Sequence, residues 1–241
     1  MSLHSNKIAE EKNIYIKELF DSLPNKSDCI SGKYKTRART LHRIFLPIYI
    51  LNAFKDQDSF TTKYFDVIIS LTIESESSLV VGFYNLGMSA LRSLLESAIK
   101  LLYYECHPIE YQLHEGSKHE LRANEYREFL YSYPEAVKID DLNSKNIETI
   151  WAELCGFVHH NYKTASKITM IKELNSIFNL NENSWQNTLK NIKRVIRVVI
   201  ILVLIVSPEW GKNAEKAYYD EVFRIFSPKE KKDIRTTFSL I

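Results

Sequence analysis

The scarcity of helix-breaking residues constrains the fold of this chain more than any other feature of its sequence. Only 6 glycines and 6 prolines occur among 241 residues, which is less than half of their usual combined share of roughly 12%. β-Sandwiches and β-barrels need such residues at many tight turns. The sequence therefore predicts an all-α fold.

The overall composition is that of a globular protein with a sizeable core. Hydrophobic residues make up 45% of the chain and charged residues 26%, which excludes disordered, collagen-like and mucin-like classes. No internal repeat, low-complexity segment or Ser/Gly linker divides the chain, so we expect one helical domain over residues 1–241. Helices are expected from near residue 58 and over about residues 5–23, 36–54, 85–105, 118–131, 144–160, 183–207, 212–226 and 229–238.

Glycines and prolines also predict where these helices bend or end. We expect the helix over residues 36–54 to bend at Pro47. A turn or kink is expected between Gly82 and Gly87. The polar, Tyr-rich segment 109–140 is expected to hold a single helix, which Pro134 ends.

The cysteines and one apolar segment bear on cellular location. Cys29, Cys106 and Cys155 are widely spaced and odd in number, which favours a reducing cytoplasm over a disulfide framework. The N-terminus has no apolar signal core, and the most apolar run, residues 195–206, is shorter than the roughly 20 residues of a bilayer span. We expect a cytoplasmic protein without membrane contact, in which this run is a buried central helix. An interfacial anchor is the alternative.

Motifs typical of cofactor and metal enzymes are absent from the sequence. It has no Walker phosphate loop, no dinucleotide glycine fingerprint, no nucleophile elbow and no zincin pair, so we expect no cofactor. Cys155 and His159 lie four residues apart and could approach Cys106 and His107 in a zinc site. No Cys-x-x-Cys spacing accompanies them, however, and we expect no metal.

Basic residues gather in two segments, although the net charge is only +2. Residues 163–197 carry seven bases and two acids. Five further bases lie close to His42 in the sequence: Lys33, Lys35, Arg37, Arg39 and Arg43. Such a segment forms either a patch that binds polyanions or a solvated face.

A polar stripe on the helix expected over residues 85–105 is the first candidate site. Arg92 and Glu96 are four residues apart on a largely apolar helix, so their side chains face the same way. Charges on such a helix are costly unless they are paired, and we therefore expect an ion pair in the core or in a cleft. The pair either fixes the helix register or lines a functional site.

The second candidate site lies at the end of the helix expected over residues 144–160. Its apolar face leads into His159, His160, Asn161 and Lys163. A histidine can act as an acid, a base or a donor to phosphate oxygens near neutral pH. It can also do no more than complement the dipole at the end of a helix, and the residues alone leave both interpretations open.

Together, residues 84–96 (YNLGMSALRSLLE) and 154–159 (LCGFVH) resemble HEPN-like proteins. More narrowly, they resemble uncharacterised bacterial helical proteins related to abortive-infection factors. The shared pattern is a helix with small residues and Arg-x-x-x-Glu, then a helix that ends in aromatic-Val-His, and it covers about residues 60–205. The resemblance implies an all-α bundle, often a homodimer, with RNA as the usual substrate.

The resemblance also implies the residues of a metal-independent ribonuclease site. In active members an Arg, four to six residues and a His form the site, helped by a polar residue on an earlier helix. His159 matches the His, and Arg92 or Glu96 matches the polar partner. No Arg precedes His159 at that spacing, whereas Arg37 and His42 do have it, outside the region of resemblance.

Two hypotheses follow. In the first, the chain is a HEPN-like protein of a phage-defence or toxin–antitoxin type system that binds RNA or a nucleotide and cleaves RNA. A His would then act as general acid or base, Arg92 would stabilise the developing charge, and Glu96 would orient Arg92. In the second, the chain is a non-catalytic, antitoxin-like interaction module with a structural Arg92–Glu96 pair.

The candidate residues and partners follow from these hypotheses. The catalytic candidates are His159, Arg92, Glu96, His42 and Arg37. The RNA-binding candidates are Lys163, Asn161, His160, Lys33, Lys35 and Arg39. The expected partners are RNA or a nucleotide, a second copy of the chain and a partner protein of the same defence system.

Overall fold

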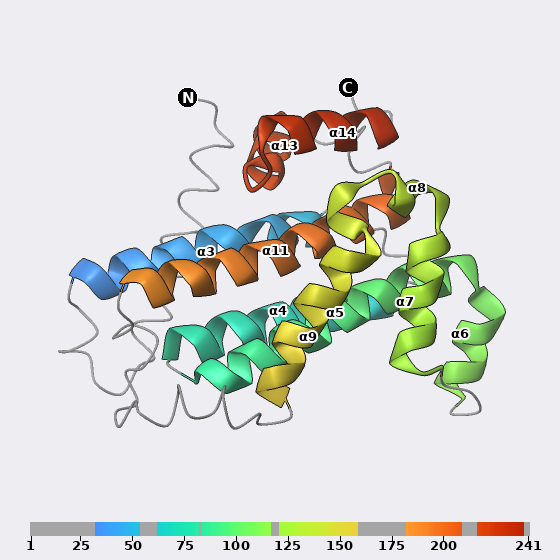
Figure 1. Ribbon diagram of the computed structural model, residues 1–241, viewed down its shortest axis with the longest axis horizontal. Coiled ribbons are helices and arrows are strands. Elements are labelled where there is room, and N and C mark those ends of the chain that lie inside the picture. Colours follow the sequence, from blue (N-terminus) through green and yellow to red (C-terminus); the bar gives the residue numbers. More distant parts are fainter. Residues whose placement is uncertain are drawn as a thin grey trace.

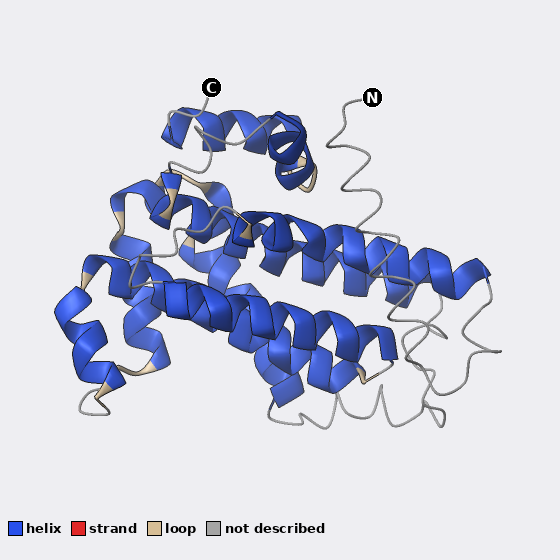
Figure 2. Ribbon diagram, turned by 180° about the vertical axis from the view of Figure 1, so that it is seen from behind, coloured by secondary structure: helices blue, strands red, loops and turns tan. Residues whose placement is uncertain are grey.

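The computed structural model describes residues 32–53, 62–81, 83–116, 121–158, 182–208 and 216–238. Within these ranges all regular structure is helical, so the prediction of an all-α class is confirmed (Figures 1 and 2). The elements are α3 (Gly32–Asn52), α4 (Thr62–Val81), α5 (Tyr84–Cys106), α6 (Pro108–Glu115), α7 (Ala123–Ser132), α8 (Pro134–Val137), η1 (Asp140–Leu142), α9 (Ser144–Val158), α11 (Glu182–Val206), α13 (Lys216–Phe223) and α14 (Pro228–Phe238). The helix expected over residues 5–23 lies outside the described residues.

The long helices form two stacked layers (Figure 1). One layer holds α3 and α11, which lie side by side, and the other holds the antiparallel pair α4 and α5. Helix α9 packs across α5, and α13 and α14 lie on the far side of the α3–α11 layer. Helices α6 and α7 cover the C-terminal end of α5.

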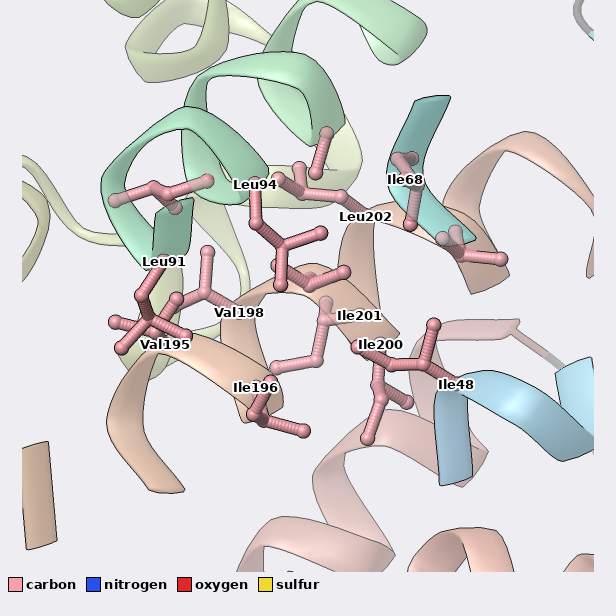
Figure 3. Close-up of a cluster of buried hydrophobic side chains, with 14 of the residues drawn as sticks. Ile48, Ile68, Leu91, Leu94, Val195, Ile196, Val198, Ile200, Ile201 and Leu202 are labelled. Carbon is pink, nitrogen blue, oxygen red and sulfur yellow. The ribbon is translucent and has the colours of Figure 1, made fainter. Parts of the chain in front are cut away.

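Helix α11 forms the centre of the hydrophobic core, as its composition predicts. From Val195 to Leu204 every side chain except that of Arg197 is buried. Leu91 and Leu94 of α5 and Ile48 of α3 pack around it (Figure 3). Within the described ranges no helix is both long and apolar enough to cross a membrane.

Helix α4 ends at Val81 and α5 begins at Tyr84, which agrees with the turn expected between Gly82 and Gly87. Gly87 itself lies inside α5 and is buried against α4. A Cβ at this position would lie 2.6 Å from Cγ of Leu79 and 3.1 Å from the carbonyl oxygen of Ser75. The Ser75 hydroxyl also donates a hydrogen bond of 2.9 Å to the carbonyl oxygen of Gly87. The glycine therefore serves the close approach of two helices.

The segment 109–140 differs from the prediction of one helix. It holds α7, but α6 and α8 also form there, and each begins at a proline. Proline suits the first helical position, where its missing N–H would have no partner within the helix. Pro47, by contrast, lies inside α3, which continues past it to Asn52.

Candidate functional site

The polar stripe of α5 contains the expected ion pair and one additional cation. Arg92 Nη2 lies 3.7 Å from Glu96 Oε2, while Lys100 Nζ lies closer, 3.1 Å from Glu96 Oε1. The side chains of Arg92 and Glu96 keep 21% and 24% of their surface exposed. The pair is thus in contact with solvent instead of being sealed in the core, and Glu96 is shared between two cations.

The indole of Trp151 on α9 brings a second arginine to this stripe. The guanidinium carbon of Arg92 lies 4.7 Å from the ring centroid of Trp151, and that of Arg127 on α7 lies 4.3 Å from it. Cations at such distances are attracted by the ring quadrupole. The resulting group from α5, α7 and α9, called here the Trp151 cluster, comprises Arg92, Glu96, Lys100, Arg127, Glu148 and Trp151.

Glu148 is the second carboxylate of the Trp151 cluster, and other groups already hold it. One of its oxygens accepts hydrogen bonds from Arg127 Nε at 2.9 Å and from the Tyr131 hydroxyl at 2.5 Å. Burial opposes ionisation of Glu148, but these two hydrogen bonds outweigh it and lower its pKa. Burial, followed by the same hydrogen bond, raises the pKa of Tyr131. Glu148 is therefore ionised at neutral pH and already accepts hydrogen bonds from Arg127 and Tyr131.

The Trp151 cluster retains the capacity to bind an anion. Its three cations face two carboxylates, one shared and one occupied. Within the described ranges the buried Nε of Arg92 has no hydrogen-bond partner, and a guanidinium is a fixed fork of donors that suits phosphate or carboxylate. An anion that reaches the exposed part of Arg92 would find a preorganised donor group.

The second candidate site begins where the described part of α9 ends. Helix α9 is described as far as Val158, and His159, His160, Asn161 and Lys163 lie outside the described residues. The last turn of α9 before them is described, and there Phe157 lies against Tyr84 at the start of α5, at a ring distance of 5.4 Å. Their roles therefore remain predictions.

The other Arg–His pair, Arg37 and His42, is buried on α3. Arg37 lies 3.3 Å from a carboxylate oxygen of Glu182, with its guanidinium carbon 4.9 Å from the ring centroid of Trp185. His42 Nδ1 lies 3.0 Å from Oε1 of the fully buried Glu76. These contacts point to α11 and α4 respectively, whereas Arg92 contacts Trp151 of α9.

Two of the three predicted RNA-binding lysines and arginines of α3 have described side chains. Lys35 is partly exposed and Arg39 is exposed. Lys33 lies within α3, but its side chain is outside what the structure describes.

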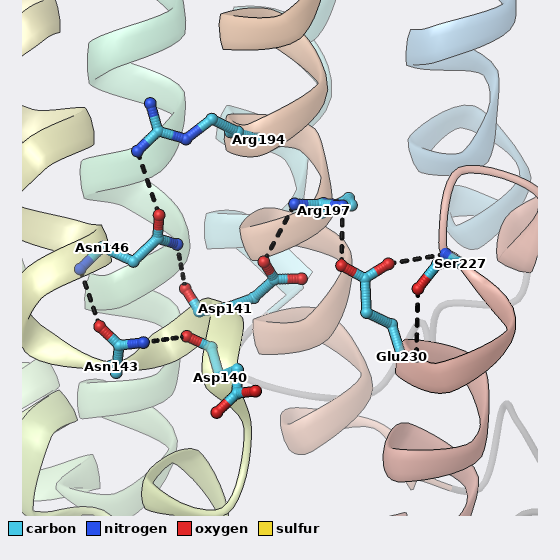
Figure 4. Close-up of polar contacts among 8 residues, drawn as sticks. All are labelled: Asp140, Asp141, Asn143, Asn146, Arg194, Arg197, Ser227 and Glu230. Atoms are coloured by element: carbon cyan, nitrogen blue, oxygen red, sulfur yellow. Dashed lines mark hydrogen bonds and ion pairs between the residues drawn. The ribbon is translucent and has the colours of Figure 1, made fainter.

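A second polar network ties α11 to the C-terminal helices (Figure 4). Arg197 donates to Glu230 of α14 at 2.9 Å and to Asp141 of η1 at 3.1 Å. Arg194, one turn earlier, donates instead to Glu153 and Asn146 of α9. Burial, the largest effect, raises the pKa of Asp141 despite the attraction of Arg197.

Several residues of these sites were missed by the sequence analysis. Lys100 continues the 92–96 spacing by another four residues, so that the stripe itself could have indicated it. Arg127 and Glu76 carried no such signal, because their contacts cross between helices that are far apart in the sequence.

Two findings concern metal binding and family membership. In the described part of the chain no group of three or more His, Cys, Asp or Glu side chains could hold a metal ion. Comparisons with protein-family models, with curated proteins and with solved structures found no match to this chain. The HEPN-like resemblance therefore stays a prediction.

Proposed function

We propose that this chain is a HEPN-like helical protein of a phage-defence or toxin–antitoxin type system, and that the Trp151 cluster binds a phosphate group of RNA or of a nucleotide. One observation carries the proposal: Arg92 is partly exposed, stacks on Trp151, and pairs with a carboxylate that it shares with Lys100. Its only carboxylate neighbour in the cluster, Glu96, lies closer to Lys100. A phosphate at the exposed part of Arg92 would accept hydrogen bonds from its terminal amino groups.

In the catalytic form of this proposal, the cluster stabilises the transition state of RNA cleavage without a metal. The 2′-oxygen bonds to the adjacent phosphorus while the bond to the 5′-oxygen breaks. A histidine, for which His159 is the candidate, takes the 2′-proton or protonates the leaving 5′-oxygen, and water makes the other proton transfer. Arg92 neutralises the charge that develops on the phosphorane oxygens, and Glu96 positions Arg92.

RNA cleavage in EDTA tests this proposal. Wild type is compared with Arg92→Met, Arg92→Lys, His159→Ala and His42→Ala, on total RNA and on tRNA. We expect Arg92→Met and His159→Ala to lose about 100- to 1000-fold in rate, because each removes a group that acts in the transition state. Arg92→Lys should lose part of the rate, since it retains the charge but not the bidentate fork.

Arg194→Met is the matched control, because Arg194 is also a partly buried arginine in an ion pair, but it contacts α9 away from Trp151. Equal losses in Arg92→Met and Arg194→Met would contradict the proposal, and so would full activity in Arg92→Met. RNA binding by the same variants is measured in parallel, so that a protein that binds RNA without cleaving it is recognised.

The second candidate function is a non-catalytic interaction module. The observation in its favour is that Arg92 and Arg127 connect α5 and α7 to the same indole of α9, which is what a purely structural element would do. In this case Arg92→Met lowers the free energy of unfolding, and neither wild type nor variant binds RNA.

A further inference from the structure

A row of exposed cations follows the outer face of α3. Lys35, Arg39 and Arg43 are spaced four residues apart, so that they lie on one side of the helix with a rise of about 6 Å between neighbours. Arg39 and Arg43 are exposed and Lys35 is partly exposed. Arg224, directly after α13, joins the row where it ends, because its guanidinium donates a hydrogen bond of 3.1 Å to the carbonyl oxygen of Arg43. These four residues are called here the α3 ridge.

The three α3 members of the ridge differ from the arginines of the clusters described above in their lack of counter-charges. Arg37, Arg92, Arg127, Arg194 and Arg197 all form ion pairs. Within the described ranges no carboxylate lies in ion-pair distance of the side chains of the three α3 members of the ridge. Glu221, which pairs with Arg224, is the acid at this end of the ridge.

The fold also brings two like charges together at the C-terminal end of the ridge. Burial, the largest cause, and the positive charge of Arg43 both lower the pKa of Arg224, against the opposing effect of Glu221. Like charges held close to each other repel, and a bound anion relieves that repulsion. The arrangement therefore favours occupation by a polyanion.

We propose that the α3 ridge binds the sugar–phosphate backbone of single-stranded RNA, with one phosphate near each of its cations. The proposal rests on the RNA-binding function proposed above and adds a second contact surface, on a different helix from the Trp151 cluster. A single row of cations with a spacing comparable to that of neighbouring phosphates fits one strand, because a duplex would present two.

A membrane surface is the other polyanion that such a row could bind. Surface-binding helices combine basic residues with large apolar side chains that enter the bilayer. The exposed large hydrophobic side chains of the described residues lie on α4, α6, α8 and around the start of α5, and none lies on α3 or α13. The ridge therefore fits the RNA backbone better.

Salt dependence of oligouridylate binding tests the ridge. The variant carries Lys35→Gln, Arg39→Gln and Arg43→Gln, and leaves Arg224 in place because it bonds to the backbone of α3. The control carries Lys138→Gln, Lys145→Gln and Lys232→Gln, three exposed lysines away from the ridge. Both variants lose the same three positive charges. Circular dichroism checks that each remains helical.

We expect the slope of log K against log salt to become shallower by about 2 in the ridge variant, since each single-strand phosphate contact contributes roughly 0.7. Affinity should fall at least about tenfold at moderate salt, and the control should behave as wild type. Equal slopes in ridge variant and wild type, or equal changes in ridge variant and control, would overturn the proposal that the ridge binds RNA. The function proposed for the Trp151 cluster would not be affected.

The remaining outcomes separate this inference from the proposed function. If Arg92→Met weakens binding while the ridge variant does not, RNA binding stands and the ridge is overturned. If wild type binds no RNA, both are overturned. Binding of wild type to vesicles that contain phosphatidylserine, lost in the ridge variant and without any RNA binding, would instead assign the ridge to a lipid surface.

Discussion

At the scale of single residues, the fully buried Glu76 shows how a polar group can be held inside this bundle. Its two oxygens are satisfied separately, one by His42 Nδ1 at 3.0 Å and the other by the Tyr49 hydroxyl at 2.8 Å. A buried carboxylate without such partners would cost several kcal/mol. The three side chains therefore act as one unit that joins α3 to α4.

We expect Glu76→Ala to lower the free energy of unfolding by about 3 kcal/mol, because it removes the buried hydrogen bonds of Glu76 to the imidazole and to the phenol hydroxyl, at roughly 1–3 kcal/mol each. Urea unfolding measures this. Glu74→Ala, two residues away on the exposed side of α4, should change it by less than about 0.5 kcal/mol. Similar values for the two variants would contradict this account.

His42→Ala should also destabilise the fold, so its effect on RNA cleavage must be judged against its stability.

Sequence reasoning reached the residue scale only where partners lie on one helix. The Arg92–Glu96 pair could be predicted because four residues on a helix bring two side chains to one face. The contacts of Arg92 and Arg127 with Trp151, and of His42 with Glu76, depend on how the helices pack. No spacing in the sequence encodes those contacts.

At the scale of elements, α4 and α5 approach each other closely at Gly87. The helix periodicity predicted α5, α9 and α11 to within about two residues at their described ends. The prolines marked boundaries correctly at α6, α8 and α14, but each also begins a helix. The turn expected between Gly82 and Gly87 agrees with the ends of α4 and α5. The packing role of Gly87 inside α5 could not be predicted, because a glycine required for close packing and one required for a turn look the same in a sequence.

Replacing Gly87 by alanine tests whether packing or helix propensity decides at this position. Alanine favours a helix interior by about 1 kcal/mol over glycine. Its Cβ would, however, meet Cγ of the buried Leu79 at 2.6 Å, and overpacking costs about 1–3 kcal/mol. We expect Gly87→Ala to lower the melting temperature, and Leu79→Ala to be less harmful in the Gly87→Ala background than in wild type. A rise in melting temperature for Gly87→Ala would show that the helices separate easily.

At the scale of the whole molecule, the all-α class could be predicted from composition, whereas the layering of the helices could not. Few glycines and prolines exclude most turns, and the apolar run 195–206 requires a central position. Which helices cover α11 depends on shape and on contacts such as those of Arg197. This residue connects α11 to two further parts of the molecule, since it binds Asp141 before α9 and Glu230 on α14.

Arg197→Met should loosen the C-terminal helices before it affects the rest of the bundle. The substitution removes two charge-assisted hydrogen bonds, worth roughly 1.5–3 kcal/mol each, and leaves Asp141 and Glu230 partly buried without their counter-charge. The methionine keeps the apolar packing of α11. Amide hydrogen exchange should therefore become faster in α14 and η1, while α5 stays protected.

Arg194→Met is the control, because it removes contacts to α9 only, so α14 should exchange as in wild type. Equally fast exchange of α14 in both variants would show that general weakening of α11, and not the Arg197 contacts, governs how firmly the C-terminal helices are held.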